Sequence, residues 1–201
     1  MKTMHKPLVA ALLIVGLAGC NKNNANEPAG AANETGSALS DFGNSAANAA
    51  GAAADIVTPT PNGQEFADKA AKSDAFEIAA GKLAATNGAS PKVKAFAAEM
   101  IKAHTASTDK IKAAAHKATA AITPDPTLTE DQKEKLDKLG KLTGAEFDRE
   151  YLSGQVEAHE DALSLMRDYA KHGDVPSLKA AAGEIAPIVQ KHLDEVKALK
   201  G

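Results

Sequence analysis

The chain has 201 residues, with 23 lysines and arginines against 26 aspartates and glutamates, and a formal net charge of −3. Such a balance offers no basic surface for nucleic acid, so we expect no nucleic-acid partner. Alanine is frequent, aromatic residues make up 3% of the chain and tryptophan is absent, which predicts an all-α protein because alanine loses no side-chain entropy in a helix.

Residues 1–19 have the composition of a secretory signal peptide. Lys2 and Lys6 precede an apolar run of eleven residues, Leu8–Ala18, which small residues follow. This run is too short to span a bilayer, which takes about 20 residues. The stretch "LAGC" (17–20) resembles a bacterial lipobox, in which the peptide is cut before the cysteine and the thiol carries a diacylglycerol. We therefore expect a lipid anchor at Cys20, the only cysteine in the chain.

The residue after the cysteine bears on where the anchor is held. It is Asn21, and no aspartate stands there to indicate retention in the inner membrane. We expect a protein of the bacterial cell envelope that is attached to a membrane through lipid. The outer membrane, facing the periplasm, is favoured over the inner membrane.

Residues 20–63 differ in composition from the rest. Stretches such as "NKNNANEPAGAANETGS" contain few large apolar side chains to bury, so they cannot offset the entropy of ordering. We interpret this segment as a flexible tether with a reach of roughly 35 Å. The stretch "TPTPNG" (58–63) ends it, and a single domain over 64–201 follows.

Helical periodicity begins at Gln64. The breaks "NGASP" and "TPDPT" predict helices over 64–87 and 91–121. Ser90 is expected to cap the second of these, with Pro91 at its first position.

Two capping-box patterns mark the next helices. Thr129 with Gln132 predicts a short helix over 129–140, and Thr143 with Glu146 predicts a long helix that ends near 172. A last helix is expected from about 176 to 199.

Four amphipathic helices with two short turns and one longer connection predict an antiparallel four-helix bundle. The short helix over 129–140 is an extra element between the second and third long helices. Pro187 lies inside the last helix, where we expect a kink.

Each of the four long helices is expected to carry an apolar stripe, a row of apolar residues along one face, and each stripe contains one ionisable residue. These residues are Glu77, His104, His159 and His192. Counting from the turns at 1.5 Å per residue places all four at depths of roughly 18 to 27 Å from the same end of the bundle. A carboxylate and three imidazoles in one layer would suit a zinc, copper or iron ion.

The same groups also suit a buried polar network without metal, because buried polar groups cost stability unless they are paired. In that alternative Glu77 accepts a hydrogen bond from His104 or His159. Three further residues would complete the network or support the metal ligands: Ser107, Tyr151 and Gln155. His116 falls off the stripe and is expected to face water.

Three segments resemble the family called domain of unknown function 4142, over roughly residues 64–199. They are "FAAEMIKAHT" (96–105), "GAEFDREYLSGQVEAH" (144–159) and "AAGEIAPIVQKHL" (181–193). The resemblance implies a ferritin-like fold and an outer-membrane location. The positions that match recurring family residues are His104, Phe147, Asp148, Tyr151, His159, Pro187 and His192.

Di-iron chemistry is not expected. It requires Glu-x-x-His motifs, but Ile101 and Val189 stand three residues before His104 and His192. No hydrolase signature is evident either, so we expect no enzyme. The function favoured by the sequence is that of a non-catalytic envelope lipoprotein that binds an envelope partner or maintains the envelope. The alternative is a metal-binding or metal-buffering domain.

Overall fold

The computed structural model describes residues 59–201. The expected signal peptide, Cys20 and all but the last few residues of the expected tether lie outside the described residues. Within residues 59–201 the chain forms five helices and no β-strand, which confirms the all-α class. The helices are α1 (Gly63–Asn87), α2 (Pro91–Ala115), α3 (Glu130–Gly140), α4 (Gly144–His172) and α5 (Pro176–Lys200). No helix in this part of the chain combines the length and the apolar character that crossing a membrane requires.

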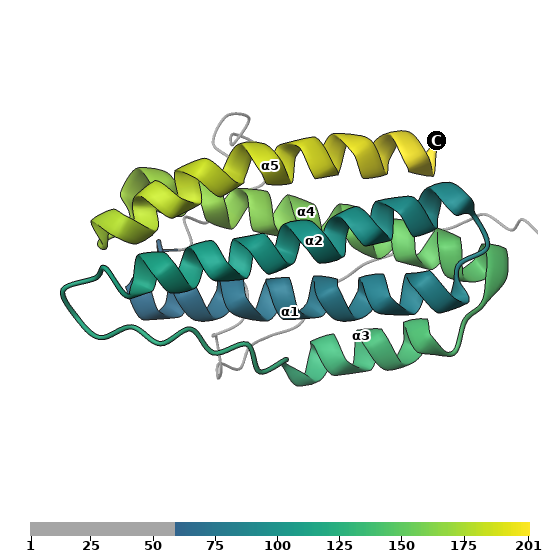
Figure 1. Cartoon of the computed structure of the whole chain (residues 1–201), viewed down its shortest axis with the longest axis horizontal. Coiled ribbons are helices and arrows are strands. Elements are labelled where there is room, and N and C mark those ends of the chain that lie inside the picture. Colours follow the sequence, from purple (N-terminus) through teal and green to yellow (C-terminus); the bar gives the residue numbers. More distant parts are fainter. Residues whose placement is uncertain (1–58) are drawn as a thin grey trace, which may run out of the picture. The chain divides into compact units, whose positions relative to one another are not determined.

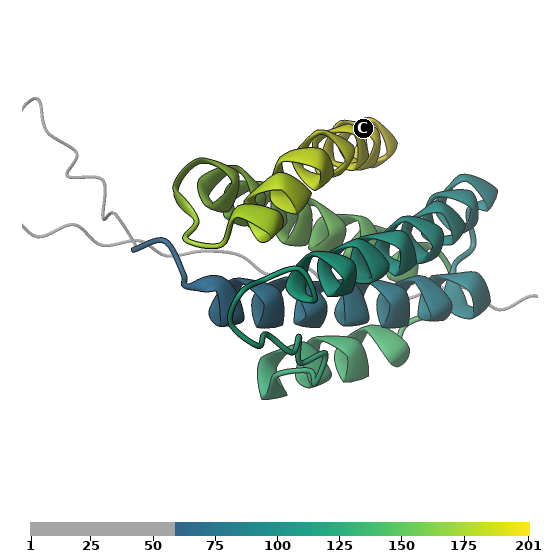
Figure 2. The same ribbon diagram turned by 60° about the vertical axis from the view of Figure 1, so that its left-hand side comes forward.

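The four long helices lie alongside one another, and α3 lies outside them (Figure 1). The closest pairs are α1 with α2 and α4 with α5, and further contacts join α2 to α5 and α1 to α4. Both views show that the helices within each of these pairs run in opposite directions (Figures 1 and 2). The middles of four helices are thereby brought to the same level.

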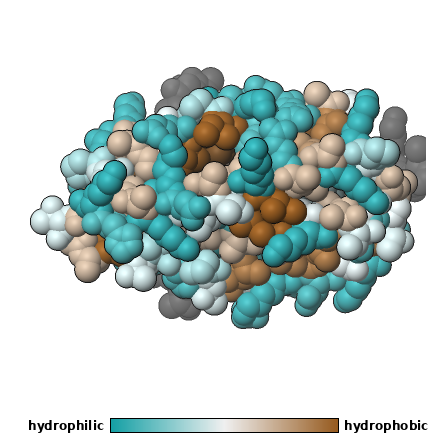
Figure 3. All heavy atoms as spheres, in the orientation of Figure 1, coloured by the Kyte–Doolittle hydropathy of each residue, from teal (hydrophilic) through white to brown (hydrophobic). Residues whose placement is uncertain are grey.

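The core between these helices is built from small side chains and a few aromatic ones. Ala67, Ala97 and Ala182 are fully buried, which allows close helix approach. Phe66 and Tyr169 stack with ring centroids 3.8 Å apart. Hydrophilic side chains cover most of the face in Figure 3, where apolar residues form only small patches.

The connection between α2 and α3 returns along α1. Gln64 donates from Nε2 to the Thr123 carbonyl at 2.8 Å, and Lys72 pairs with Asp125 at 2.5 Å. Ile122 packs against the core. These contacts explain why α2 ends at Ala115 and not at residue 121 as predicted: tertiary contacts override the helix propensity of the alanine-rich segment.

Helix capping differs from the sequence prediction at two of three sites. Thr129 and Gln132 form the expected reciprocal cap on α3. Ser90 makes no side-chain cap with the described residues. Instead, the Asp148 carboxylate on α4 accepts from the backbone N–H groups of Ala89 and Ser90, at 3.1 and 2.8 Å.

The second wrong prediction is the capping box at the start of α4. Thr143 makes no side-chain cap with the described residues. Gly144 enters the helix with φ of +67°, a conformation that glycine adopts freely. The chain therefore turns into α4 by a route that a threonine cap does not follow.

Candidate metal centre

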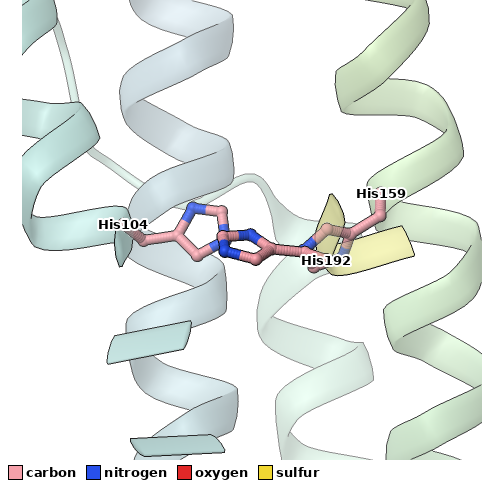
Figure 4. Close-up of side chains that lie close together, drawn as sticks. All are labelled: His104, His159 and His192. Carbon is pink, nitrogen blue, oxygen red and sulfur yellow. The ribbon is translucent and has the colours of Figure 1, made fainter. Parts of the chain in front are cut away.

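Three histidines from three helices meet inside the domain. His104 on α2, His159 on α4 and His192 on α5 are 6%, 1% and 3% exposed. One nitrogen of each lies within 4.8 Å of the nitrogens offered by the other two. Figure 4 shows the three rings converging. We call these residues the histidine triad.

Helical periodicity accounts for this convergence. Each histidine occupies a position on a stripe whose neighbours one turn away are buried, such as Met100 before His104 and Val189 before His192. The stripes must face inward to bury these apolar neighbours. The imidazoles are therefore carried into the core by the residues around them.

Two of the triad rings form a hydrogen bond with an acceptor outside the triad. Nδ1 of His104 lies 2.8 Å from Oδ1 of Asp74 on α1. Nδ1 of His159 lies 2.8 Å from the backbone carbonyl of Gln155. A carbonyl oxygen can only accept, so Nδ1 of His159 carries the hydrogen, and a carboxylate imposes the same arrangement on His104.

The nitrogens on the other side of these rings are left without partners. Nε2 of His104, Nε2 of His159 and Nδ1 of His192 are buried and make no hydrogen bond with the described residues. When these two rings are neutral, each presents a lone pair at Nε2, which is the form that binds metal ions.

Asp74 is the residue that sequence reasoning missed. It is 3% exposed, and its second oxygen accepts from Thr108 Oγ1 at 3.0 Å. It stands three residues before Glu77, a spacing that places both carboxylates on one face of α1. That spacing indicates that both carboxylates can face inward, but it does not tell which of them reaches a histidine ring.

Glu77 lies near the triad but outside it. It is 1% exposed, and its Oε2 accepts from Nε2 of Gln155 at 2.5 Å. The group of residues able to share one ion does not include it. The expected hydrogen bond from a histidine to Glu77 is also absent among the described residues, because His104 pairs with Asp74.

The remaining members of the expected network are only partly engaged. Gln155 contributes both its side chain, to Glu77, and its carbonyl, to His159. The hydroxyls of Ser107 and Tyr151 are buried and make no hydrogen bond within residues 59–201. The polar layer is thus incomplete as a self-contained network.

Burial controls the protonation of two triad members. It lowers the pKa of His159 to about 4, with the charge of His104 adding to the effect. It also lowers the pKa of His192 to about 4, helped by the charges of His159 and His104. Both rings are therefore neutral at physiological pH.

The carboxylates act in the opposite direction on His104. Burial lowers its pKa, but the hydrogen bond with Asp74 and the charges of Glu77 and Asp74 outweigh burial, so that the pKa is raised overall. Burial also raises the pKa of Glu77. An ion bound at Nε2 of His104 would displace any proton held there.

The other histidines of the domain lie away from this layer. His116 follows the end of α2 and is exposed, as expected. His172 ends α4, where its Nδ1 lies 2.9 Å from Asp168.

Comparison with known proteins adds a family and a fold. The family model described as domain of unknown function (DUF4142) matches residues 45–199. No curated protein matches the sequence.

Two solved structures share the fold. One is the crystal structure of a DUF305 fragment from Deinococcus radiodurans, which has a TM-score of 0.60 and 12% identity, covering 71% of this chain and 97% of that one. The other is described as CopM in the Cu(I)-bound form, which has a TM-score of 0.56 and 15% identity, covering 69% and 95%.

Proposed function

The chain belongs to the DUF4142 family, and from the geometry of its histidine triad we propose that the helical domain binds one transition-metal ion. One observation carries the proposal. The Nδ1–H groups of His104 and His159 are bonded to acceptors outside the triad, so that Nε2 of each is left unpaired and directed to the shared centre. This is the arrangement by which outer carboxylates and carbonyls orient histidine ligands.

The ligand set favours copper or zinc. Imidazole suits both ions, and metal–nitrogen bonds of about 2.0–2.1 Å place tetrahedral ligands about 3.3 Å apart. The triad nitrogens lie within 4.8 Å of one another, so small side-chain rotations would close the site. The resemblance in fold to a protein described as Cu(I)-bound is compatible with copper. The same histidines also leave iron open as a weaker candidate.

We propose that the role is to hold or buffer the ion without catalysis. Asp74 and Glu77, the two carboxylates next to the triad, are engaged by His104 and Gln155. Both carboxylates therefore hold neighbouring side chains in place, and Glu77 lies outside the group of residues that could share the ion.

The alternative is a structural polar core without metal. It would require the triad nitrogens to be paired, but three of them have no partner among the described residues. We therefore favour the metal site over the interaction role that the sequence alone favoured.

We also propose that the four long helices form an antiparallel bundle of ferritin-like type. The opposed directions of the contacting pairs and the length of the connection that contains α3 support this description. The carboxylate set of a di-iron centre is not part of the proposal, because Ile101 and Val189 occupy the positions that such a site requires.

The proposed location is the bacterial cell envelope, with Cys20 as the lipid anchor, and the outer membrane is favoured. An envelope protein that exchanges metal with the domain is a fitting partner. The lipobox-like stretch motivates the anchor. Cys20→Ala should release the chain from the membrane fraction, whereas a variant that stays membrane-bound after a salt wash would place the anchor elsewhere.

The metal proposal is tested by stoichiometry and X-ray absorption on the full chain, loaded separately with Zn²⁺ and with Cu⁺. We expect one ion per chain and a first shell of nitrogen neighbours at about 2.0–2.1 Å. His159→Ala should abolish tight binding, while His116→Ala, which alters an exposed histidine, should retain it. Unchanged binding in His159→Ala would overturn the proposal.

A further inference from the structure

A cavity of about 120 Å³ adjoins the histidine triad. Its walls come from α1, α2, α4 and α5 and are mostly small or aliphatic. The apolar residues that close it include Ala103, Ala162, Met166, Ile185 and Val189. The polar residues in its lining are His104 and His192 of the triad, together with Ser73, Asp74, Ser107 and Lys110.

The cavity lies on one side of the triad only. Ser107 stands three residues after His104, Ala162 three after His159, and Val189 three before His192. Because α5 runs opposite to α2 and α4, all three are one turn from the triad in the same direction. In the other direction, Gln155 and Glu77 fill the space one turn away and are buried.

An ion held by three imidazoles would keep an open position toward this cavity. Three protein ligands leave a fourth tetrahedral position for a water or another molecule. Glu77 is held on the opposite side by Gln155 and is not grouped with the triad. A molecule that enters the cavity would therefore reach the open position from the cavity side.

The size and charge of the cavity limit what can enter. A cavity of about 150 Å³ holds benzene, so this smaller one, of about 120 Å³, suits a ring smaller than benzene, such as a five-membered ring. The apolar walls oppose a charged molecule, and the Asp74 side chain in the lining disfavours an anion. One buried hydroxyl, Oγ of Ser107, has no hydrogen-bond partner among the described residues and so can accept from an N–H.

We propose that this cavity binds one small neutral nitrogen heterocycle, which donates a ring nitrogen to the triad-bound ion and an N–H to Oγ of Ser107. The inference rests on the proposed function and specifies the ligand of the same site. Ile188 lines the cavity and is 45% exposed, which places the entrance between α2 and α5. The pair Lys110–Glu184 joins these two helices at the rim.

The experiment uses the full chain loaded with Co²⁺, whose visible absorption reports the coordination of the ion. Imidazole at about pH 8, where it is neutral, is the probe. We expect a saturable spectral change without loss of the ion. Ala103→Leu, which fills the cavity, should weaken imidazole binding at least tenfold, whereas Ala79→Leu, half-buried outside the cavity, should not.

The hydrogen bond to Ser107 has its own control. Because 1-methylimidazole lacks the N–H, it should bind about 3- to 10-fold more weakly than imidazole. This difference should vanish in Ser107→Ala, a variant that does not depend on how well Ala103→Leu folds.

The outcomes separate the two proposals. A normal Co²⁺ spectrum that does not respond to imidazole would overturn the inference alone. So would an imidazole affinity in Ala103→Leu equal to that of the wild type, or a wild-type preference for imidazole over 1-methylimidazole in Ser107→Ala. Stripping of the ion by imidazole would overturn it as well. Absence of any bound Co²⁺ would overturn the metal site and the inference with it.

Discussion

The contact between Asp74 and His104 fixes the orientation of the His104 ring in the site. The carboxylate holds Nδ1 at 2.8 Å and is itself fixed by Thr108. Outer partners of this kind raise the basicity of the ligand and fix the orientation of its ring. The site is therefore preformed at His104 before any ion arrives.

Asp74→Asn should weaken metal binding by about 10- to 100-fold, because the neutral amide no longer supports the ligand electrostatically. Competition with a chelator of known affinity measures the change. Asp109→Asn, which neutralises an exposed carboxylate on the same pair of helices, serves as the control. Equal affinities in the two variants would show that Asp74 has no part in the site.

The triad also predicts a pH dependence of the metal-free protein. The pKa values of His159 and His192 are lowered to about 4, below the value near 6.5 of an unfolded chain. The unfolded state therefore binds more protons between these values, and the free energy of unfolding falls as the pH drops from about 6.5 to 4. For His159 the loss is about 3 kcal/mol at the acid end of this window. His104 adds nothing to this slope, because its pKa is raised; its contribution is complete below 6.5 and is lost as the pH rises through the folded value.

Urea unfolding with EDTA at several pH values measures this slope. His159→Gln should flatten it, while His116→Gln should leave it unchanged because that side chain is exposed. A slope that is the same in His159→Gln and in the wild type would mean that the ring is not buried in its neutral form.

The positions of the triad histidines could be predicted from the sequence, whereas the residues that form hydrogen bonds with them could not. Helical periodicity alone places His104, His159 and His192 on inward stripes, and counting from the turns places them at one level. Which carboxylate reaches a ring depends on the rotation of α1 by a fraction of a turn. That rotation is set by packing, so Asp74 and Glu77 could not be distinguished beforehand.

At the scale of helices, the start of α2 depends on a residue far away in the chain. Asp148, on α4, accepts from two backbone N–H groups just before the helix. Local patterns could identify Ser90 and Pro91 as a start but could not reveal a cap supplied from another helix. The end of α2 was mispredicted because nonlocal contacts decide it, and the cap at the start of α4 was mispredicted because Gly144 leads the chain into the helix without one.

Asp148→Ala should lower the free energy of unfolding by about 1–2 kcal/mol, because two charge-assisted hydrogen bonds are lost. Ser90→Ala should change it by less than about 0.5 kcal/mol, since Ser90 makes no cap with the described residues. Chemical denaturation of both variants decides between the two caps. A larger loss of unfolding free energy in Ser90→Ala than in Asp148→Ala would show that the serine caps α2.

At the scale of the whole molecule, the all-α class and the helix order followed from composition and breaks. The lengths of α1, α4 and α5 agree with the sequence prediction to within one or two residues, because strong breakers flank them. The path of the connection along α1 was not predictable, since it depends on side-chain contacts such as that of Gln64 with Thr123.

Three of the long helices each supply one ligand to the triad, and α1 supplies Asp74 behind it. An ion bound to the triad would therefore link α2, α4 and α5, and its binding free energy would add to the stability of the whole fold. Metal binding and global stability should change together.

The most direct test of the central claim is the melting temperature of the full chain at neutral pH, measured in EDTA and with Zn²⁺ or Cu⁺ added. With free metal at about 100 times the dissociation constant, binding adds about 2.7 kcal/mol, so the account predicts a rise of several degrees. The rise should vanish in His192→Ala and persist in His116→Ala. A wild-type melting temperature that is the same with EDTA and with either metal, while His104→Ala, His159→Ala and His192→Ala each still melt earlier, would contradict the metal site and leave a structural polar core.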